Sequence, residues 1–212
     1  MDVRSFTVGP VQENCYLARR DGADRAVVVD PGEEPDRLLN VIERLGVELD
    51  AILLTHTHFD HIGAVAPVAR ATGAEVWVPE VEREVLADIN SYVPFAGFGP
   101  FESYEAEHTL SGGERLELAG FSIDVLFTPG HSPGHVTFSI SDEAAIFSGD
   151  VLFQGSVGRT DLPFGDWATL LRSIETLMDA LPPETTVYPG HMGITTLGAE
   201  RALNPFLAEL AR

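Results

Sequence analysis

The chain has 212 residues, of which 44% are hydrophobic and 22% charged, a balance typical of a globular protein with a substantial core. All 13 basic residues are arginines, and 33 acidic residues bring the formal net charge to −20. Such an acidic surface repels phosphate backbones and offers no basic patch for counterion release, which argues against a nucleic-acid-binding protein.

The sequence also carries no mark of a membrane or secreted protein. No apolar run approaches the roughly 18 residues of a spanning helix, and the start M1-D-V-R-S-F does not resemble a secretory signal. The single cysteine, Cys15, has no disulfide partner, so we expect a small buried residue in a cytoplasmic protein. Without repeats or long linkers, residues 1–212 are expected to form one domain.

In the first half of the chain, short apolar runs alternate with helical patterns. A26-V-V-V29 and A51-I-L-L54 are typical of buried strands. Apolar residues recur at helical spacing from Leu38 to Leu45, and Gly46 suits the end of that helix. The elements expected next are a helix over Ile62–Thr72, a strand over Glu75–Val78 and a helix from Pro79 to about Ala87.

The second half is richer in strands. F121-S-I-D-V-L-F127 and V136-T-F-S-I140 alternate as half-buried strands do, and A144-A-I-F147 is a third strand. Asp166 is expected to cap a helix with its apolar face formed by Trp167, Leu170, Leu171, Ile174, Leu177 and Met178. A strand at Thr185–Tyr188 and a short helix near Leu197–Leu203 follow. Strands with helices in both halves favour two packed sheets flanked by helices.

Metal-ligand residue types gather directly after these strands. T55-H-T-H-F-D-H61 holds four of them, and L126-F-T-P-G-H131, I146-F-S-G-D150 and V187-Y-P-G-H191 each end in one more. Strand ends can direct loop residues at one shared edge. The seven residues are therefore candidates for a single site: His56, His58, Asp60, His61, His131, Asp150 and His191.

Imidazole and carboxylate are ligands for zinc and also for iron or manganese. His56 and His58 can face one ion from an extended turn, while Asp60 and His61 can reach a second ion. Seven ligands, with one carboxylate able to bridge, fit two metals, which can make hydroxide at neutral pH and so favour hydrolysis. The alternative is a loop of surface histidines with His131 and His191 unrelated to it.

These motifs resemble the metallo-β-lactamase superfamily, whose H-x-H-x-D-H signature matches H56-T-H-F-D-H61. The resemblance implies an α/β fold, a four-layer αβ/βα sandwich of two mixed sheets flanked by helices. It also implies that His56, His58 and His131 bind one metal, that Asp60, His61 and His191 bind the other, and that Asp150 bridges them. Asp60 and Asp150 would thereby position the nucleophilic hydroxide.

Within the superfamily the chain is most similar to the glyoxalase II-like group, in its short single-domain members. The motifs that carry this similarity are V29-D-P-G32, T128-P-G-H-S-P-G-H135, S148-G-D150, G158-R-T-D161 and L203-N-P-F-L207. The resemblance implies two divalent metal ions, with zinc preferred over iron or manganese. It also implies hydrolysis of small thioesters such as S-lactoylglutathione. Two alternatives stay open: a persulfide dioxygenase with one iron, and a lactonase or other ester or amide metallohydrolase.

The resemblance defines the substrate contacts less fully than the metal ligands. Arg159 matches a basic glutathione-binding position, but Asp161 replaces the aromatic residue expected nearby, and the helical domain that completes the glutathione site in two-domain relatives is not expected here. We expect Arg159 either to contact an anionic part of the substrate or to pair with Asp161. A homo-oligomer stays open, as does a substrate contact from the aromatic stretch S91-Y-V-P-F-A-G-F-G-P-F101.

Three further polar residues allow two interpretations each. His135 is expected to make a supporting hydrogen bond rather than to bind metal, because the ligand set is complete without it. Asp30 follows a strand and is either a turn residue or a hydrogen-bond acceptor behind the ligands. His108 lies among acidic residues and is expected to be a solvated surface residue, with a contact at the rim of the site as the alternative.

Overall fold

Two six-stranded sheets form the centre of the computed structural model, which describes residues 1–93 and 95–208. The first sheet has the order β1-β2-β3-β4-β5-β6. Its strands are β1 (Asp2–Val8), β2 (Glu13–Arg19), β3 (Arg25–Val29), β4 (Glu48–Leu53), β5 (Glu75–Pro79) and β6 (His108–Leu110). β1 to β3 are antiparallel, and β3 to β6 are parallel, so the sheet is mixed.

The second sheet has the order β14-β13-β10-β9-β8-β7 and is also mixed, with β10 and β13 parallel. Its strands are β7 (Arg115–Leu118), β8 (Phe121–Phe127), β9 (Val136–Ile140), β10 (Ala145–Gly149), β13 (Thr186–Pro189) and β14 (Thr195–Thr196). β11 (Leu152–Phe153) and β12 (Ser156–Val157) form a separate hairpin.

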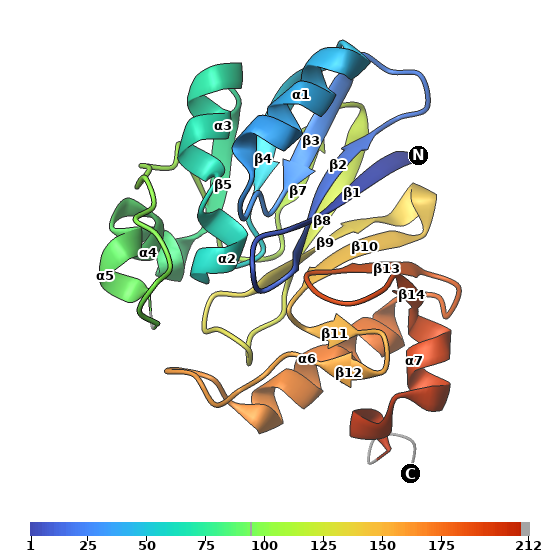
Figure 1. The fold of residues 1–212 in the computed structure, drawn as a ribbon. Helices are drawn as coiled ribbons and strands as arrows, with labels where there is room; N and C mark the ends of the chain where they lie inside the picture. The colour runs from blue at the N-terminus through green and yellow to red at the C-terminus, as the bar shows by residue number, and fades with distance from the viewer. Residues whose placement is uncertain (94, 209–212) are drawn as a thin grey trace.

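Helices cover the outer faces of both sheets (Figure 1). On the first sheet lie α1 (Pro35–Leu45), α2 (Phe59–Ile62), α3 (Val65–Thr72), α4 (Arg83–Ala87) and α5 (Ile89–Tyr92), with the 3₁₀ turn η1 (Glu80–Glu82). On the second lie α6 (Trp167–Ala180) and α7 (Leu197–Leu203), with η3 (Pro205–Leu207) nearby, and η2 (Ser141–Glu143) joins β9 to β10. The protein is thus the four-layer sandwich that the sequence predicted.

Three apolar clusters hold these layers together. One joins α1 and α3 to the first sheet, a second fills the space between the sheets, and a third joins α6 and α7 to the second sheet. The middle cluster contains Phe121, Phe138 and Phe147, each at most 1% exposed. Because both sheets contribute to it, neither sheet can bury its inner face without the other.

Local signals explain several helix ends. Gly46 ends α1 in the left-handed conformation, with φ of 61°, as the sequence predicted. Asp166 caps α6 by accepting a hydrogen bond of 2.7 Å from the backbone N–H of Thr169. Trp167, however, was wrongly placed on the buried face of α6, since it is 41% exposed at the first turn.

The predicted helix over Ile62–Thr72 is also wrong in its first turn. α2 ends at Ile62 and α3 begins only at Val65. At this break the backbone N–H of Ala64 donates to the carbonyl of Pro31 at 3.0 Å. A Cβ on Gly63 would lie 2.5 Å from the carbonyl oxygen of Gly32, so the chain passes too close to the turn after β3 for a larger residue.

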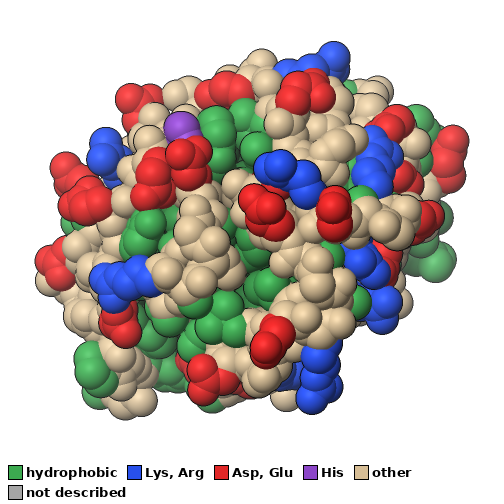
Figure 2. Space-filling view, turned by 90° about the horizontal axis from the view of Figure 1, so that it is seen from above, with side chains coloured by type: hydrophobic (Ala, Val, Ile, Leu, Met, Phe, Trp, Pro, Cys, Tyr) green, Lys and Arg blue, Asp and Glu red, His purple; other side chains and the backbone are tan. Residues whose placement is uncertain are grey.

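The surface matches the acidic composition. Figure 2 shows acidic groups scattered over the face seen from above, with arginines among them rather than gathered into one basic patch. Among the residues described, none of the helices has the length and apolar content that a bilayer crossing needs.

Candidate metal centre

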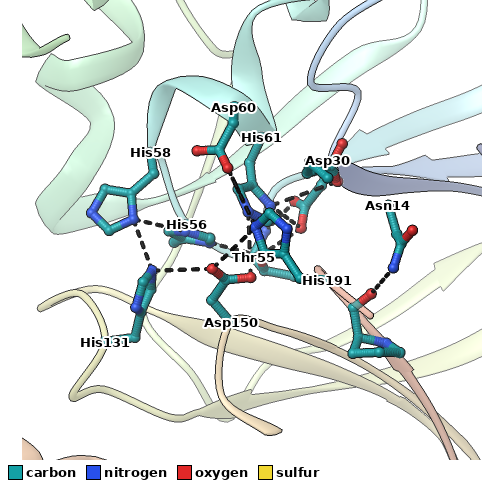
Figure 3. Close-up of polar contacts among 12 residues, drawn as sticks. Asn14, Asp30, Thr55, His56, His58, Asp60, His61, His131, Asp150 and His191 are labelled. Carbon is teal, nitrogen blue, oxygen red and sulfur yellow. Dashed lines mark hydrogen bonds and ion pairs between the residues drawn. The ribbon is translucent and has the colours of Figure 1, made fainter. Parts of the chain in front are cut away.

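The seven candidate ligands come together at one edge of the sandwich (Figure 3). His56 and His58 follow β4, and Asp60 and His61 lie in α2 directly after them. His131, Asp150 and His191 follow β8, β10 and β13, which run in the same direction. The carboxyl ends of these strands therefore lie at one edge, which explains why distant segments of the chain meet there.

The first group consists of His56, His58 and His131. The Nε2 atom of His56 lies 3.1 Å from Nδ1 of His58, and that Nδ1 atom lies 2.8 Å from Nε2 of His131. Donor atoms held around one ion by metal–nitrogen bonds of about 2.0–2.1 Å are about 3.3 Å apart in a tetrahedron. The two separations of 3.1 and 2.8 Å are slightly shorter than that value.

The second group consists of Asp60, His61 and His191. Oδ2 of Asp60 lies 3.3 Å from Nε2 of His191 and 3.9 Å from Nε2 of His61. Both groups satisfy the spacing of a metal site, with all ligand atoms within 4.8 Å of one another in each group.

Asp150 lies between the two groups. Its Oδ1 atom is 3.4 Å from His61, and its Oδ2 atom is 3.4 Å from His131 and 3.5 Å from His191. One carboxylate therefore contacts imidazoles from both groups, as a bridging ligand must.

Hydrogen bonds on the outer side of the imidazoles determine which ring nitrogen is protonated. Nδ1–H of His131 donates to the carbonyl of Arg159 at 2.8 Å, and Nδ1–H of His191 donates to the carbonyl of Gln12 at 3.2 Å. Carbonyl oxygens only accept, so Nδ1 carries the proton in both rings. The Nε2 atoms of both rings therefore face into the site, where each could offer its lone pair to a metal.

Asp30 orients two more imidazoles. Its Oδ2 atom accepts from Nδ1–H of His61 at 3.1 Å and from the hydroxyl of Thr55 at 2.6 Å. The Thr55 hydroxyl is in turn 3.1 Å from Nδ1 of His56 and accepts from it. Asp30 also has a positive φ of 48°, which is typical of a turn. The residue is therefore both a turn residue and a hydrogen-bond acceptor behind the ligands.

The atoms that face the inside of the site form an environment that favours a cation. Nε2 of His61 and Oδ1 of Asp150 are buried without a hydrogen-bond partner among the residues described. Burial alone would lower the pKa of His61, but the Asp150 and Asp60 carboxylates raise it well above its usual value. Burial would raise the pKa of Asp150, yet His61 and His191 hold it far below its usual value. Metal cations fit this arrangement of inward lone pairs and carboxylates.

We expect the metal-free protein to be most stable near pH 6.5. Although burial opposes it, Asp150 and Asp60 raise the pKa values of His61 and His191. The stability contributed by these two protonated histidines is lost as the pH rises through their raised pKa values. Burial lowers the pKa of His58 to about 4 and that of His56 well below its usual value. As the pH falls below about 6.5, these histidines bind protons in the unfolded state but not in the folded state, so stability is also lost on the acid side.

Thermal unfolding in chelator from pH 4.5 to 9 measures this dependence. In the metal-loaded protein the alkaline loss should disappear, because metal replaces the protons on these ligands. Equal alkaline losses with and without metal would contradict the prediction.

His135 supports the centre rather than joining it. Its Nε2 atom accepts from the backbone N–H of Asp150 at 3.1 Å, and its Nδ1 atom lies 3.0 Å from the hydroxyl of Thr128. Burial holds its pKa well below the usual value, so the ring stays neutral. The predicted supporting hydrogen bond is confirmed.

Two supporting residues were missed from the sequence. Asn14 donates to the carbonyls of Pro189 and Met192 at 3.1 and 2.9 Å, and so holds the turn that carries His191. Glu82, in η1, accepts hydrogen bonds from both loops of the first histidine group. Neither residue belongs to a motif with metal-ligand spacing.

A third buried residue, Glu13, also escaped prediction. It is fully buried, and neither of its carboxyl oxygens has a hydrogen-bond partner among the described residues. Oε1 of Glu13 lies 3.8 Å from Nδ1 of His61. Burial raises the pKa of Glu13 well above its usual value, which favours a neutral carboxyl group beside Asp30 and His61.

The side chain of Arg159 forms a bidentate ion pair with Asp161, at 2.7 and 2.8 Å. This is the structural alternative considered for the residue, and the pair is exposed, with 54% and 70% of the two side chains accessible. The backbone of Arg159 has a separate role, because its carbonyl accepts from His131.

Other residues considered from the sequence lie outside the centre. His108 stacks on Trp77 with 4.0 Å between ring centroids and contacts Glu75 at 2.7 Å. Cys15 is buried and free, as expected. In the 91–101 stretch, Phe98 and Phe101 pack on Phe59, and Pro94 lies outside the described residues.

Comparisons with known proteins support the fold, and they show similarity to hydrolases. The family model of the metallo-beta-lactamase superfamily matches residues 8–191. The chain is 37% identical over 220 residues to "Hydroxyacylglutathione hydrolase GloC" of Haemophilus influenzae, covering 98% of both chains.

Two solved structures are similar over nearly the whole chain. One is the crystal structure of BLEG-1 B3 metallo-beta-lactamase, with 41% identity, a TM-score of 0.92 and coverage of 98% of this chain and 100% of that one. The other is that of TTHA1623 in a di-iron-bound form, with 42% identity, a TM-score of 0.80 and coverage of 96% and 100%.

Proposed function

Because the chain belongs to the metallo-beta-lactamase superfamily and is related to metallohydrolases, we propose that it is a dinuclear enzyme that hydrolyses thioesters. The observation that carries the proposal is the position of Asp150, which contacts His131 of one histidine group and His61 and His191 of the other. A carboxylate placed between two ligand groups supports a two-metal site.

We propose that His56, His58 and His131 hold one divalent metal, that Asp60, His61 and His191 hold the second, and that Asp150 bridges them. When bound, such metals lower the pKa of a water molecule and polarise a carbonyl oxygen. Zinc suits this set of imidazoles and carboxylates, and iron is the alternative, since TTHA1623 was solved in a di-iron-bound form.

The protein's own contribution is to hold the ligands rigidly. Asp30 and Thr55 fix the rings of His56 and His61, while backbone carbonyls fix His131 and His191. A leaving thiolate has a pKa of roughly 8.5, so cleavage of a thioester requires no strong acid from the protein. The lack of a dedicated general acid in the ligand set is therefore compatible with this reaction.

A thioester derived from glutathione is the substrate class that the relative GloC suggests by its name. Weak selectivity for glutathione is expected, because Asp161 takes the place of an aromatic contact and Arg159 is paired with it. We further propose that residues 1–212 act as one domain on a small molecule in the cytoplasm, a setting that the free thiol of buried Cys15 supports.

Metal analysis combined with a substrate panel tests the proposal. We expect two metal ions per chain and hydrolysis of S-lactoylglutathione and of simpler thioesters. One iron per chain, with oxygen consumed in the presence of glutathione persulfide and no thioester cleaved, would instead establish the persulfide dioxygenase. The panel should include a β-lactam and a lactone, since the similarity to BLEG-1 makes amide or ester hydrolysis the second candidate.

Arg159→Ala is expected to raise the KM for anionic thioesters without changing metal content or thermal stability. The exposed pair with Asp161 contributes little to stability, whereas a guanidinium can bind a substrate carboxylate through two hydrogen bonds. Asp161→Asn, which frees the guanidinium, should lower that KM.

Arg115→Ala is the matched control, because Arg115 forms a similar exposed bidentate pair with Asp124 elsewhere. An unchanged KM with lower thermal stability in Arg159→Ala would identify Arg159 as a structural brace only.

A further inference from the structure

An apolar pocket opens directly beside the metal centre. It has a volume of about 340 Å³ and shares Thr57, His58 and Phe59 with the loop of the first ligands. Its walls come from η1, α4 and α5 on one side and from residues 162–164 on the other. A molecule reacting at the centre can therefore extend into this pocket without leaving the protein surface.

The walls of the pocket offer little to a charged group. Val81, Val85, Ile89, Leu162 and Phe164 are among its lining residues, and no arginine of the described chain is. Two acidic residues also line it: Glu82 is only 4% exposed and both of its oxygens accept hydrogen bonds from the protein, whereas Glu84 is exposed and disfavours an anionic group. The pocket is thus suited to an uncharged, apolar group.

Two of the apolar residues are unusually exposed. Phe164 is 83% exposed and Val81 is 69% exposed, on opposite sides of the pocket. Phe164 also has a positive φ of 69°, which is costly for a residue with a large side chain. These two exposed side chains give the pocket an apolar rim on both sides.

We propose that this pocket binds the acyl chain of the substrate, and that the enzyme prefers thioesters of medium-length apolar acids. The proposal rests on the thioesterase function above and specifies its substrate class. The pocket volume of about 340 Å³ and the apolar lining suit an acyl chain of several carbons. The charged groups of a glutathione tripeptide do not suit these apolar walls, so the thiol carrier lies outside the pocket.

A series of acyl thioesters of N-acetylcysteamine tests the assignment, because the neutral carrier stays constant while the acyl chain changes. We expect kcat/KM to rise about fourfold for each added methylene from acetyl to octanoyl, as each is removed from water. Calorimetric titration of metal-free protein with neutral octanamide should detect binding, whereas acetamide should not bind.

Val81→Asp places a charge at the pocket entrance and should remove most of the gain from chain length, measured as the ratio of kcat/KM for the octanoyl thioester to that for the acetyl thioester. The matched control is Leu203→Asp, since Leu203 is 81% exposed in α7 and does not line the pocket. Hydrolysis of all chain lengths at one rate would overturn the pocket assignment alone. No hydrolysis of any thioester would overturn the thioesterase function and this substrate class with it.

A second, independent observation concerns Glu82. Its Oε2 atom accepts from the backbone N–H and the hydroxyl of Thr57 at 2.8 and 2.9 Å. Its Oε1 atom accepts from the hydroxyl of Ser132 at 2.6 Å and from the backbone N–H of Gly134 at 2.7 Å. Thr57 separates His56 from His58, and Ser132 follows His131, so one carboxylate joins the two loops of the first histidine group.

We infer that Glu82 is a positioning residue that sets the distance between these two loops and thereby the geometry of the first metal position. Glu82→Gln keeps the shape of the side chain but replaces one acceptor oxygen with an N–H₂ group, which cannot accept from a backbone N–H. One of the two loops then loses its partner.

Cobalt(II) substitution provides a readout other than activity. We expect Glu82→Gln to lower the cobalt affinity of one of the two positions by about tenfold to a hundredfold and to change the visible absorption spectrum. kcat should fall with little change in KM.

Glu200→Gln is the matched control, since Glu200 is also 4% exposed and accepts from Gly155, Thr195 and Asn204. Loss of thermal stability in both variants, with the cobalt affinity and spectrum of Glu82→Gln unchanged, would overturn the positioning role. A wild-type protein that binds no cobalt would overturn it as well.

Discussion

Asp150→Ala is expected to lower turnover by about three orders of magnitude and to reduce the metal content of the purified protein. The variant removes the carboxylate that lies 3.4 to 3.5 Å from His61, His131 and His191. Without this carboxylate, the site has less negative charge to offset the repulsion between two neighbouring cations. A thousandfold loss corresponds to about 4 kcal/mol of transition-state stabilisation, a plausible share for a metal-assisted reaction.

Metal content by elemental analysis and turnover with saturating thioester measure this effect. Asp179→Ala is a suitable control, because Asp179 is an exposed acid paired with Arg201 in α7. An Asp150→Ala protein with two tightly bound ions and normal turnover would refute the bridging role.

Gly190→Ala should reduce turnover by at least about a hundredfold while leaving every candidate ligand in the chain. A Cβ atom at this position would lie 2.3 Å from Oδ1 of Asp150 and 2.7 Å from Cε1 of His61. Such contacts require Asp150 or the backbone to move, and a displacement of about 1 Å at a reacting centre costs about a hundredfold in rate.

Gly198→Ala provides the control, since its Cβ would lie 2.9 Å from the carbonyl oxygen of Pro183, away from the metal centre. Both variants should lose some thermal stability, but only Gly190→Ala should lose metal affinity. Equal turnover in the two variants would show that the space beside Asp150 is not needed.

The parts of the fold that the sequence predicted are those with a clear local pattern. The apolar runs around Val27 and Ile52 are buried strands, and the helix from Asp166 begins with a capping residue. β1 and β2 were missed because their signals conflict. β1 alternates weakly at an edge of the sheet, and β2 is buried on both faces yet begins with the polar residues Glu13 and Asn14.

The candidate site shows the same division. The seven ligand positions could be proposed from residue type and spacing, since histidines and aspartates directly follow apolar runs. Glu82 and Asn14 could not, because their partners lie 25 to 52 and 175 to 178 residues away and depend on how the two sheets are packed. No local pattern marks an ordinary glutamate or asparagine for contacts of that range.

The hydrogen bonds of Asn14 also determine when the centre can be completed during synthesis of the chain. A nascent chain that ends at Asp150 already contains six of the seven candidate ligands. It lacks β13 and the turn at 189–192, to which the start of β2 is bonded across 175 residues or more. Contacts of such sequence separation form late, because closure of a long loop must come first. The second ligand group, to which His191 belongs, can therefore be completed only after the 189–192 turn has been synthesised and bonded to the start of β2.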